Sequence, residues 1–124
     1  AQAETAEQQW LMEHCTEYGF ILRYPSDKVD ITKIGYESWH YRYVGKPHAY
    51  YMFANNLCFE EYIELLRGYT FDGKHLEITD DEGYHWEIYF VPAVSETTQV
   101  PVPKNTPYEI SGNNVDGFIV TMSR

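Results

Sequence analysis

A glutamate and a histidine lie three positions apart in a short aromatic-rich segment, Glu37 and His40. A hydrolytic metal site needs imidazole or carboxylate ligands and one open position for water. It also needs a base that takes a proton from that water. Glu37 and His40 are of the right types for the base and for one ligand. Taken alone, however, a Glu and a His at this spacing favour an ordinary surface glutamate and a half-buried histidine.

The spacing of this pair sets a condition on the local backbone. On a strand, residues two apart share a face and residues three apart do not. Glu37 and His40 are therefore expected to converge on one metal only if Glu37 lies in the turn just before the strand. The preceding Gly35-Tyr36 favours such a turn.

A helix is predicted at the start of the chain. Thr5-Ala6-Glu7-Gln8 fits a capping box, in which the Thr5 hydroxyl and the Gln8 side chain satisfy free backbone N–H groups. Apolar residues then recur at helical spacing up to Tyr18, and Gly19 supplies the stop. The first segment is therefore interpreted as a helix over residues 5–18.

Two strands and a turn region follow this helix. Phe20–Tyr24 is a short β-rich run, and residues 25–35 are polar and turn-like. Within the turn region, Asp30 is placed to cap a short helical turn. Ser38–Val44 alternates large rings with polar groups and is predicted to be a strand that ends at Gly45.

Two helices are predicted after this strand. Pro47 suits the first helical residue, because its missing N–H would be unpaired there anyway. That helix is expected to end at about Asn55 or Asn56. The second helix, Phe59–Arg67, has apolar residues at helical spacing and ends at Gly68.

The pattern changes to strands after Gly68, with turn-forming residues between them. We therefore predict an α+β protein with a helix-containing part over residues 1–68 and an antiparallel β extension over residues 69–124. The strands predicted in the extension are Lys74–Thr79, Tyr84–Val91, Thr97–Val102, Tyr108–Ser111 and Gly117–Met122.

The composition limits both the size of the fold and the kinds of partner that the chain can bind. The chain has 124 residues, of which 44% are hydrophobic, enough for one compact domain or for one small domain with an appendage. Its formal net charge is −10, and it has no cluster of Lys and Arg that would release counterions from a phosphate backbone. Nucleic acid is therefore not an expected partner.

The two cysteines, Cys15 and Cys58, do not form a zinc-finger or thioredoxin pattern. Two half-buried free thiols are the favoured interpretation, and a disulfide between them remains the alternative. The sequence has no run of about 20 apolar residues of the kind that spans a membrane.

The segments around Glu37 and His40 resemble one family. Tyr18–Pro25 reads Y-G-F-I-L-R-Y-P, Asp30–Thr32 reads D-I-T, and Tyr36–Gly45 reads Y-E-S-W-H-Y-R-Y-V-G. These motifs, in this order, resemble the VanY branch of the D-alanyl-D-alanine carboxypeptidases, which are zinc peptidases, over about residues 5–68. That family usually has proline between the Glu and the Trp. Ser38 stands there in this chain, a difference that affects the stiffness of the turn and no reacting atom.

The resemblance implies roles for individual residues. Glu37 would be the general acid/base and His40 the C-terminal zinc ligand. Trp39 would form a wall of the site and help to fix His40, although a place in the core is equally compatible with it. Arg42 and Tyr43 are on the same strand and are interpreted either as structural or as facing the substrate. In this scheme zinc acidifies a water and polarises the scissile carbonyl.

The resemblance also implies that part of the site is missing. The other two zinc ligands of the family come from an S-x-H-x-x-G-x-x-x-D motif before the first helix, and only four residues precede that helix here. The substrate-binding arginine of the family is also expected upstream. Arg23, Tyr24 and Asp30 are interpreted as framework for the loop before Glu37. Packed or solvent-facing roles are expected for the other histidines, which are His14, His48, His75 and His85.

The function implied by the resemblance is removal of terminal D-alanine from peptidoglycan stem peptides. The fold implied is the C-terminal part of a Hedgehog/D-Ala-D-Ala-peptidase-like fold, followed by the small antiparallel β unit. The parent would be an extracellular or cell-envelope bacterial zinc enzyme that acts on stem peptides ending in D-Ala-D-Ala. This chain alone, as a fragment, would be inactive and would pair with an N-terminal fragment or self-associate.

A second interpretation is a non-catalytic cell-wall-binding or interaction module derived from the peptidase. Its binding surface would be the aromatic-rich β half, with Tyr84, Trp86 and Tyr89 near one another. The sequence encoded just before Ala1 distinguishes the two interpretations, because the missing ligand motif would lie there in the enzyme.

Overall fold

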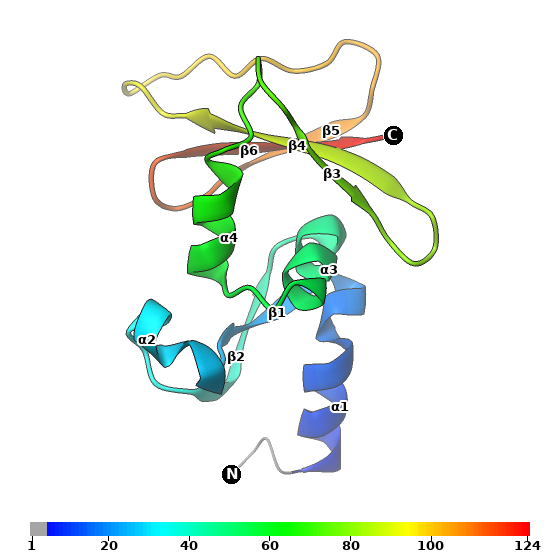
Figure 1. Ribbon diagram of the computed structural model, residues 1–124, viewed down its shortest axis with the longest axis vertical. Helices are drawn as coiled ribbons and strands as arrows, with labels where there is room; N and C mark the ends of the chain where they lie inside the picture. Colours follow the sequence, from blue (N-terminus) through cyan, green and yellow to red (C-terminus); the bar gives the residue numbers. More distant parts are fainter. Residues whose placement is uncertain (1–4) are drawn as a thin grey trace. The chain divides into compact units, whose positions relative to one another are not determined.

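The structure is a computed structural model that describes residues 5–124 (Figure 1). The chain divides into two compact units, Ala1–Tyr62 and Ile63–Arg124. This division falls inside the helix α4 (Phe59–Leu66), whereas the sequence predicted a boundary after residue 68. Helices and antiparallel sheets are both present, so the predicted α+β class is confirmed.

The first unit opens with the helix α1 (Ala6–His14), which continues as a 3₁₀ turn over Cys15–Tyr18. The Thr5 hydroxyl accepts a hydrogen bond from the backbone N–H of Gln8 at 3.1 Å, as the capping box predicts. The other half of the box does not form, because Gln8 Oε1 is buried without a hydrogen-bond partner. Gly19 ends the segment in the left-handed conformation, with φ of 87°.

The two strands predicted next pair with each other. The strand β1 (Phe20–Tyr24) runs antiparallel to β2 (Glu37–Tyr43) in a two-stranded sheet. Between them lies the short helix α2 (Val29–Thr32), which follows directly on a 3₁₀ turn. Asp30 was predicted to cap this helix and instead lies inside it, since the residue before its first turn is Lys28.

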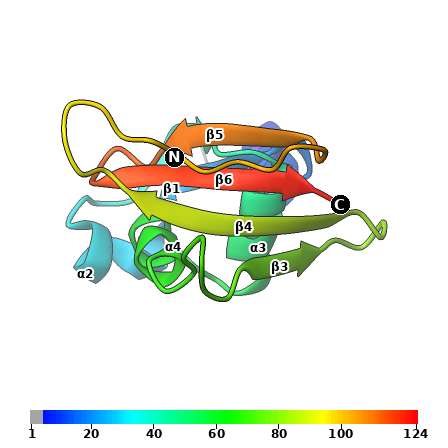
Figure 2. The same ribbon diagram turned by 90° about the horizontal axis from the view of Figure 1, so that it is seen from above.

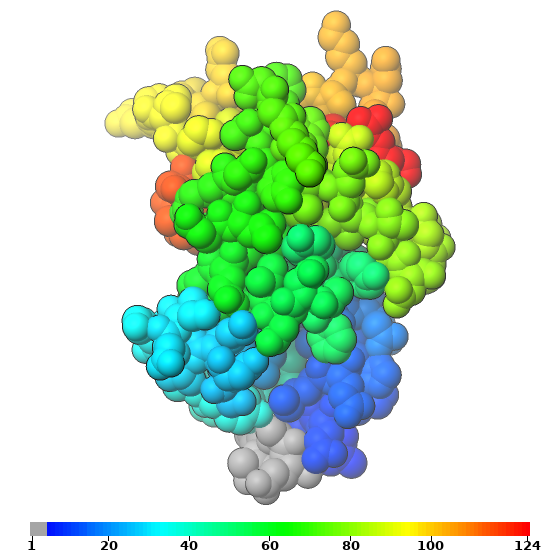
Figure 3. Space-filling model, in the orientation of Figure 1, coloured from blue at the N-terminus to red at the C-terminus, as the bar shows by residue number. Residues whose placement is uncertain are grey.

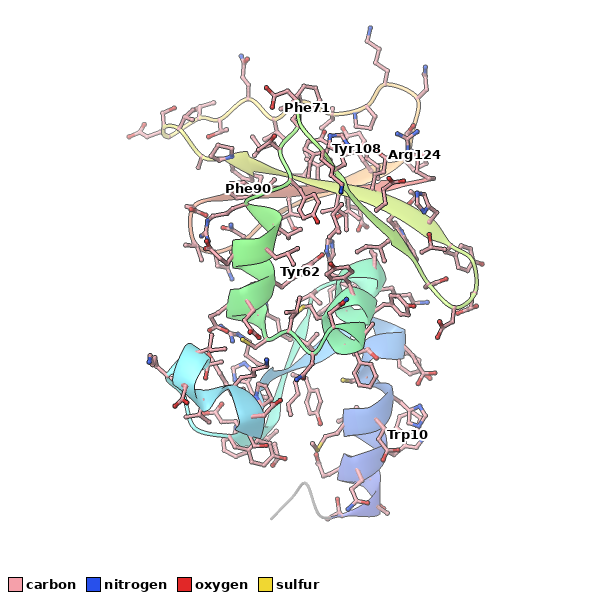
Figure 4. All side chains as sticks on the ribbon, in the orientation of Figure 1. Trp10, Tyr62, Phe71, Phe90, Tyr108 and Arg124 are labelled. Carbon is pink, nitrogen blue, oxygen red and sulfur yellow. The ribbon has the colours of Figure 1, made fainter. Side chains whose placement is uncertain are left out.

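The helices α3 (Lys46–Ala54) and α4 complete the first unit. Pro47 lies in the first turn of α3, as predicted. Tyr62 reaches from α4 to α3, where its hydroxyl is 2.6 Å from His48 Nδ1 (Figure 4). Neither helix, nor any other among residues 5–124, has the length and apolar character needed to cross a membrane. Buried apolar residues of this unit include Cys15, Ile21, Ala49, Met52, Cys58, Phe59 and Tyr62.

The second unit contains a four-stranded antiparallel sheet in the order β3-β4-β6-β5, seen from above in Figure 2. Its central pair, β4 and β6, is buried over most of its length, whereas every residue of β5 is exposed. The antiparallel β extension predicted from the sequence is therefore formed. Its strands are β3 (Leu76–Thr79), β4 (His85–Pro92), β5 (Tyr108–Gly112) and β6 (Gly117–Ser123).

The third of the five strands predicted in this part of the chain, Thr97–Val102, does not form. This segment is part of the loop between β4 and β5, which lies at the surface of the second unit and is coloured yellow to orange in Figure 3. Pro101 and Pro103 lack the N–H groups that a ladder needs, which explains why the segment adds no strand to the sheet. The loop still packs on the sheet, because the Tyr89 hydroxyl donates a hydrogen bond to the carbonyl of Pro101.

Candidate functional site

Glu37 and His40 meet at the surface of the two-stranded sheet. Glu37 Oε1 lies 3.2 Å from His40 Nδ1, so the two side chains that the sequence singled out do converge. The Glu37 side chain is 28% exposed and the His40 side chain 46% exposed. Both groups can therefore be reached from solvent, as a ligand and a base that handle water must be.

The convergence arises in a way that the sequence did not predict. Glu37 is the first residue of β2 and does not lie in the preceding turn. Leu22 pairs with Tyr41, but Tyr24 pairs with Glu37, so the three residues 38–40 of β2 lie opposite Arg23 alone. Such a bulge interrupts the alternation of side chains and re-aims the bulged residues. This irregularity brings two residues three positions apart to one side of the strand.

The surroundings of His40 come from three elements of the first unit. The ring of Tyr24, on β1, meets the imidazole edge-on, with centroids 5.1 Å apart and planes at 80°. The Arg23 guanidinium lies over the Tyr24 ring at 4.5 Å and over the Phe59 ring at 4.8 Å. Arg23 also donates two hydrogen bonds, of 2.9 and 2.8 Å, to the carboxylate of Glu60 on α4.

Burial acts to raise the pKa of Glu60, but other interactions outweigh it. Hydrogen bonds from Arg23 and from the Glu60 backbone amide, together with the charge of Arg23, hold this pKa below its usual value. Glu60 is therefore ionised near neutral pH and forms a charged, bidentate pair with Arg23.

The other residues proposed for the site lie on the same strand. Trp39 is 62% exposed and Tyr43 is 61% exposed, and the Tyr43 ring meets Phe20 edge-on. Arg42 packs its guanidinium over the Phe59 ring at 4.4 Å. The ring that contacts His40 is Tyr24, which the sequence had assigned to the framework. No sequence signal could have found this contact, because it depends on the bulge opposite Arg23.

The remaining histidines have partners of their own. His14 stacks on Trp10, with ring centroids 4.6 Å apart, and pairs with Glu17, while His48 is buried against Tyr62. His75 bonds to Glu87 and to the carbonyl of Phe71, and His85 bonds to Thr79 and Glu77. None of these contacts involves Glu37 or His40.

A zinc ion in a hydrolytic enzyme usually has three protein ligands and one open position. Glu37 and His40 offer two donor groups. Within the described part of the chain, residues 5–124, no group of three or more His, Cys, Asp or Glu side chains is arranged to hold a metal. The residues present thus offer one carboxylate and one imidazole, and by themselves they do not fit a complete zinc site.

The two cysteines are free, and both are buried in the first unit. Burial raises the pKa of both thiols, Cys15 and Cys58. They are accordingly the free thiols that the sequence favoured, and they are more deeply buried than expected.

The aromatic surface proposed for the β half is only partly formed. Tyr84 and Trp86 lie near each other, with ring centroids 6.2 Å apart, and Tyr84 is exposed. Tyr89 is fully buried in the cluster of Val91, Val120 and Met122, so it takes no part in any exposed surface.

Comparison with known proteins identifies the relatives of this chain. Residues 1–46 match the family model described as VanY, D-alanyl-D-alanine carboxypeptidase. A D-alanyl-D-alanine carboxypeptidase of Enterococcus faecium is 46% identical over 94% of this chain. The bifunctional D-Ala-D-Ala dipeptidase and D-Ala-D-Ala carboxypeptidase VanXYC of Enterococcus gallinarum is 48% identical over 51% of this chain.

One solved structure matches nearly the whole chain. It is the vancomycin-resistance D,D-dipeptidase VanXYg in complex with a D-Ala-D-Ala phosphinate analogue, with a TM-score of 0.83 and 42% identity. The match covers 91% of this chain, which is more than the first unit contains, so the β sheet of the second unit is shared as well.

The chain spans only part of these relatives. It covers 36% of the E. faecium carboxypeptidase, 33% of VanXYC and 45% of the VanXYg chain. Over the part of these relatives that the chain covers, the sequence motifs, the family match and the similarity in structure all indicate the same family. The chain is related to the VanY-type D-alanyl-D-alanine carboxypeptidases.

Proposed function

We propose that this chain forms part of a zinc-dependent D-alanyl-D-alanine carboxypeptidase that removes the terminal D-alanine from peptidoglycan stem peptides. The observation that carries the proposal is the convergence of Glu37 and His40, 3.2 Å apart on the exposed side of a bulged strand. The relatives support it, because the proteins that match most of the chain are D-alanyl-D-alanine peptidases by name.

Glu37 is the residue proposed to move the proton. As a general base it takes a proton from the attacking water, and as a general acid it returns that proton to the amine of the leaving D-alanine. Glu37 lies at the start of β2, partly exposed and beside His40, so its carboxylate is accessible to the attacking water and to the leaving amine.

His40 is proposed as one zinc ligand. The other ligands would come from outside residues 5–124, because the described residues do not supply them. Trp39 and Tyr43, both exposed on the same strand, are proposed to wall the substrate site. The packing of Arg42 on Phe59 supports a structural role for that side chain.

The proposed partner is a peptidoglycan stem peptide ending in D-Ala-D-Ala, and the proposed location is the outside of a bacterial cell or its envelope, where such peptides are exposed. A non-catalytic wall-binding module is less well supported, because Tyr89, one of its three proposed surface residues, is buried. We also propose that the 124-residue chain alone pairs with the segment that supplies the other ligands or with a second copy of itself.

The proposal is tested by expressing the whole reading frame that contains residues 1–124 and purifying it free of chelator. The expected result is release of one D-alanine from a synthetic peptide ending in D-Ala-D-Ala, with no release from the same peptide ending in L-Ala-L-Ala. A metal-loaded protein that binds the D-Ala-D-Ala peptide but releases no D-alanine would overturn the assignment as an enzyme. It would favour the binding module instead.

A further inference from the structure

The His40 imidazole is held by few contacts. Glu37 Oε1 approaches Nδ1 at 3.2 Å, and the Tyr24 ring meets the imidazole edge-on at 5.1 Å. The His40 side chain is otherwise 46% exposed. A histidine that binds a metal needs a fixed ring plane, which neighbouring groups normally provide, and loss of such groups weakens metal binding. Tyr24 is the aromatic neighbour available here to fix that plane.

Tyr24 has an unusual place in the sheet. Its backbone pairs with Glu37, whereas its ring contacts His40, because the bulge lies directly beside it. A single residue of β1 therefore touches both members of the proposed site, one through the backbone and the other through its ring. A change in the orientation of the Tyr24 ring would be transmitted to the imidazole.

The Tyr24 ring is in turn fixed by Arg23. The guanidinium lies 4.5 Å from the centroid of the Tyr24 ring and 4.8 Å from that of Phe59. The Arg23 side chain is only 13% exposed, and each of its two terminal nitrogens donates a hydrogen bond to the Glu60 carboxylate, at 2.9 and 2.8 Å. A bidentate pair of this kind fixes the plane of the guanidinium as well as its position.

We propose that Tyr24, Arg23 and Glu60 are positioning residues that fix the ring plane of His40. The order of contacts runs from the α4 carboxylate of Glu60 to the guanidinium, then to the Tyr24 ring and then to the imidazole. The inference rests on the proposed function in one respect, namely that the fixed imidazole serves as a zinc ligand. The contacts themselves require neither zinc nor substrate.

A neighbouring ion pair offers a matched control. Lys28 binds Glu61, the residue after Glu60 on α4, at 2.9 Å. Lys28 is as well covered as Arg23, with its side chain 14% exposed, but no ring contact leads from it to Tyr24 or His40. Loss of the Lys28 pair should therefore loosen α4 to a similar degree without affecting the imidazole.

The test is NMR spectroscopy of the 124-residue chain with labelled histidines, without metal or substrate. The His40 ring resonances, identified with His40→Gln, are expected to be displaced from those of an exposed histidine by the ring current of Tyr24. Tyr24→Leu and Arg23→Met should remove most of this displacement. Tyr24→Phe, which keeps the ring, and Lys28→Met, which breaks only the control pair, should retain it.

Two results would overturn the inference. One is a displacement of the His40 resonances that is unchanged in Arg23→Met, because Tyr24→Leu also removes the ring that causes the displacement. The other is an equal loss of displacement in Lys28→Met, which would mean general loosening of the unit. If Tyr24→Leu does not fold, Glu60→Gln together with Arg23→Met decides between the same outcomes. Because no activity is measured, a failure here is distinct from a failure of the proposed carboxypeptidase function.

Discussion

Glu37 and His40 carry the chemistry proposed for this protein, and their geometry sets what each can do. Glu37 Oε1 faces His40 Nδ1 at 3.2 Å, and both side chains are partly exposed. A base needs to reach the proton that it removes, and a ligand needs an open nitrogen. At the level of single residues, the proposed site is therefore a candidate base and a candidate ligand placed side by side.

The role of Glu37 can be separated from that of His40 by mutation of the whole protein. Glu37→Ala should keep its zinc and lose D-alanine release by about 10²- to 10⁴-fold, because a general base contributes by that factor. Zinc content is measured by elemental analysis, and D-alanine release by a coupled amino-acid assay. Glu82→Ala, in an exposed turn of the second unit, is the control and should behave as the unmodified protein.

An active Glu37→Ala enzyme would remove Glu37 from the mechanism. If the variant instead loses its zinc, Glu37 belongs among the ligands, and the division of roles between the two residues is wrong.

His48 on α3 is buried against Tyr62 of α4. This burial should make the stability of the first unit depend on pH. Burial lowers the pKa of His48 to about 4, below the value of roughly 6.5 for an unfolded chain. The unfolded state then binds the proton more tightly, so the contribution is fully present above pH 6.5 and is lost as the pH falls toward 4. The total loss is expected to be about 3 kcal/mol.

This contribution is measured by urea denaturation of the chain at pH 7.5 and at pH 4.5. His48→Gln cannot titrate but can still bond to the Tyr62 hydroxyl, so the fall in unfolding free energy between the two pH values should be smaller in the variant. An equal fall in both proteins would show that other groups account for the acid sensitivity.

The junction between the first helical segment and β1 depends on one glycine. Gly19 has φ of 87°, and a Cβ placed there would lie 2.7 Å from Tyr43 Cε1 and 3.1 Å from the backbone nitrogen of Lys46. Gly19→Ala should therefore lower the free energy of unfolding by about 2 kcal/mol, since the left-handed conformation alone costs roughly 1–2 kcal/mol.

Gly35 provides the comparison, because a Cβ there would meet nothing within 4 Å. Gly35→Ala should leave the thermal and chemical stability unchanged or raise it by up to about 1 kcal/mol. If both substitutions have the same effect, the crowding at Gly19 is relieved by the surrounding segment, and its conformation is not essential.

For the molecule as a whole, the first unit leaves apolar surface uncovered. Among residues 5–62, its sheet has two strands, so each of them has an edge that no other described strand pairs with, and Trp39 and Tyr43 are exposed on β2. We expect the 124-residue chain to self-associate, with a mass in light scattering that rises with concentration. Trp39→Ser with Tyr43→Ser should reduce that association. A monodisperse monomer at every concentration would contradict it.

Zinc binding by the 124-residue chain is a second property of the whole molecule. Calorimetric titration should detect weak or no binding, because a multi-ligand site contributes about 10 kcal/mol or more and His40 is a single imidazole. Tight binding at one zinc per chain would mean that other ligands join His40 or that a second copy supplies them. Repeating the titration with His40→Ala would then show whether His40 takes part at all.

Several local features were predictable because they depend on neighbours in the sequence. The Thr5 cap, the end of the first segment at Gly19 and the start of α3 at Pro47 follow from residue types a few positions apart. The strand predicted at Thr97–Val102 was wrong, since Pro101 lies within it and Pro103 directly after it, and neither can donate to a ladder. The alternation of polar and apolar residues, from which the strand was predicted, carries no information about the backbone N–H that proline lacks.

The sequence by itself determined the α+β class, most of the helices and strands, and the identity of the Glu37–His40 pair, because these depend on residue type and short-range spacing. Only the tertiary structure decided how the pair meets. The pairing of β1 with β2 places residues 38–40 opposite Arg23, and that bulge turns Glu37 and His40 to one side and brings Tyr24 against the imidazole. Register is set by contacts between segments that are distant along the chain, so no local pattern contains it.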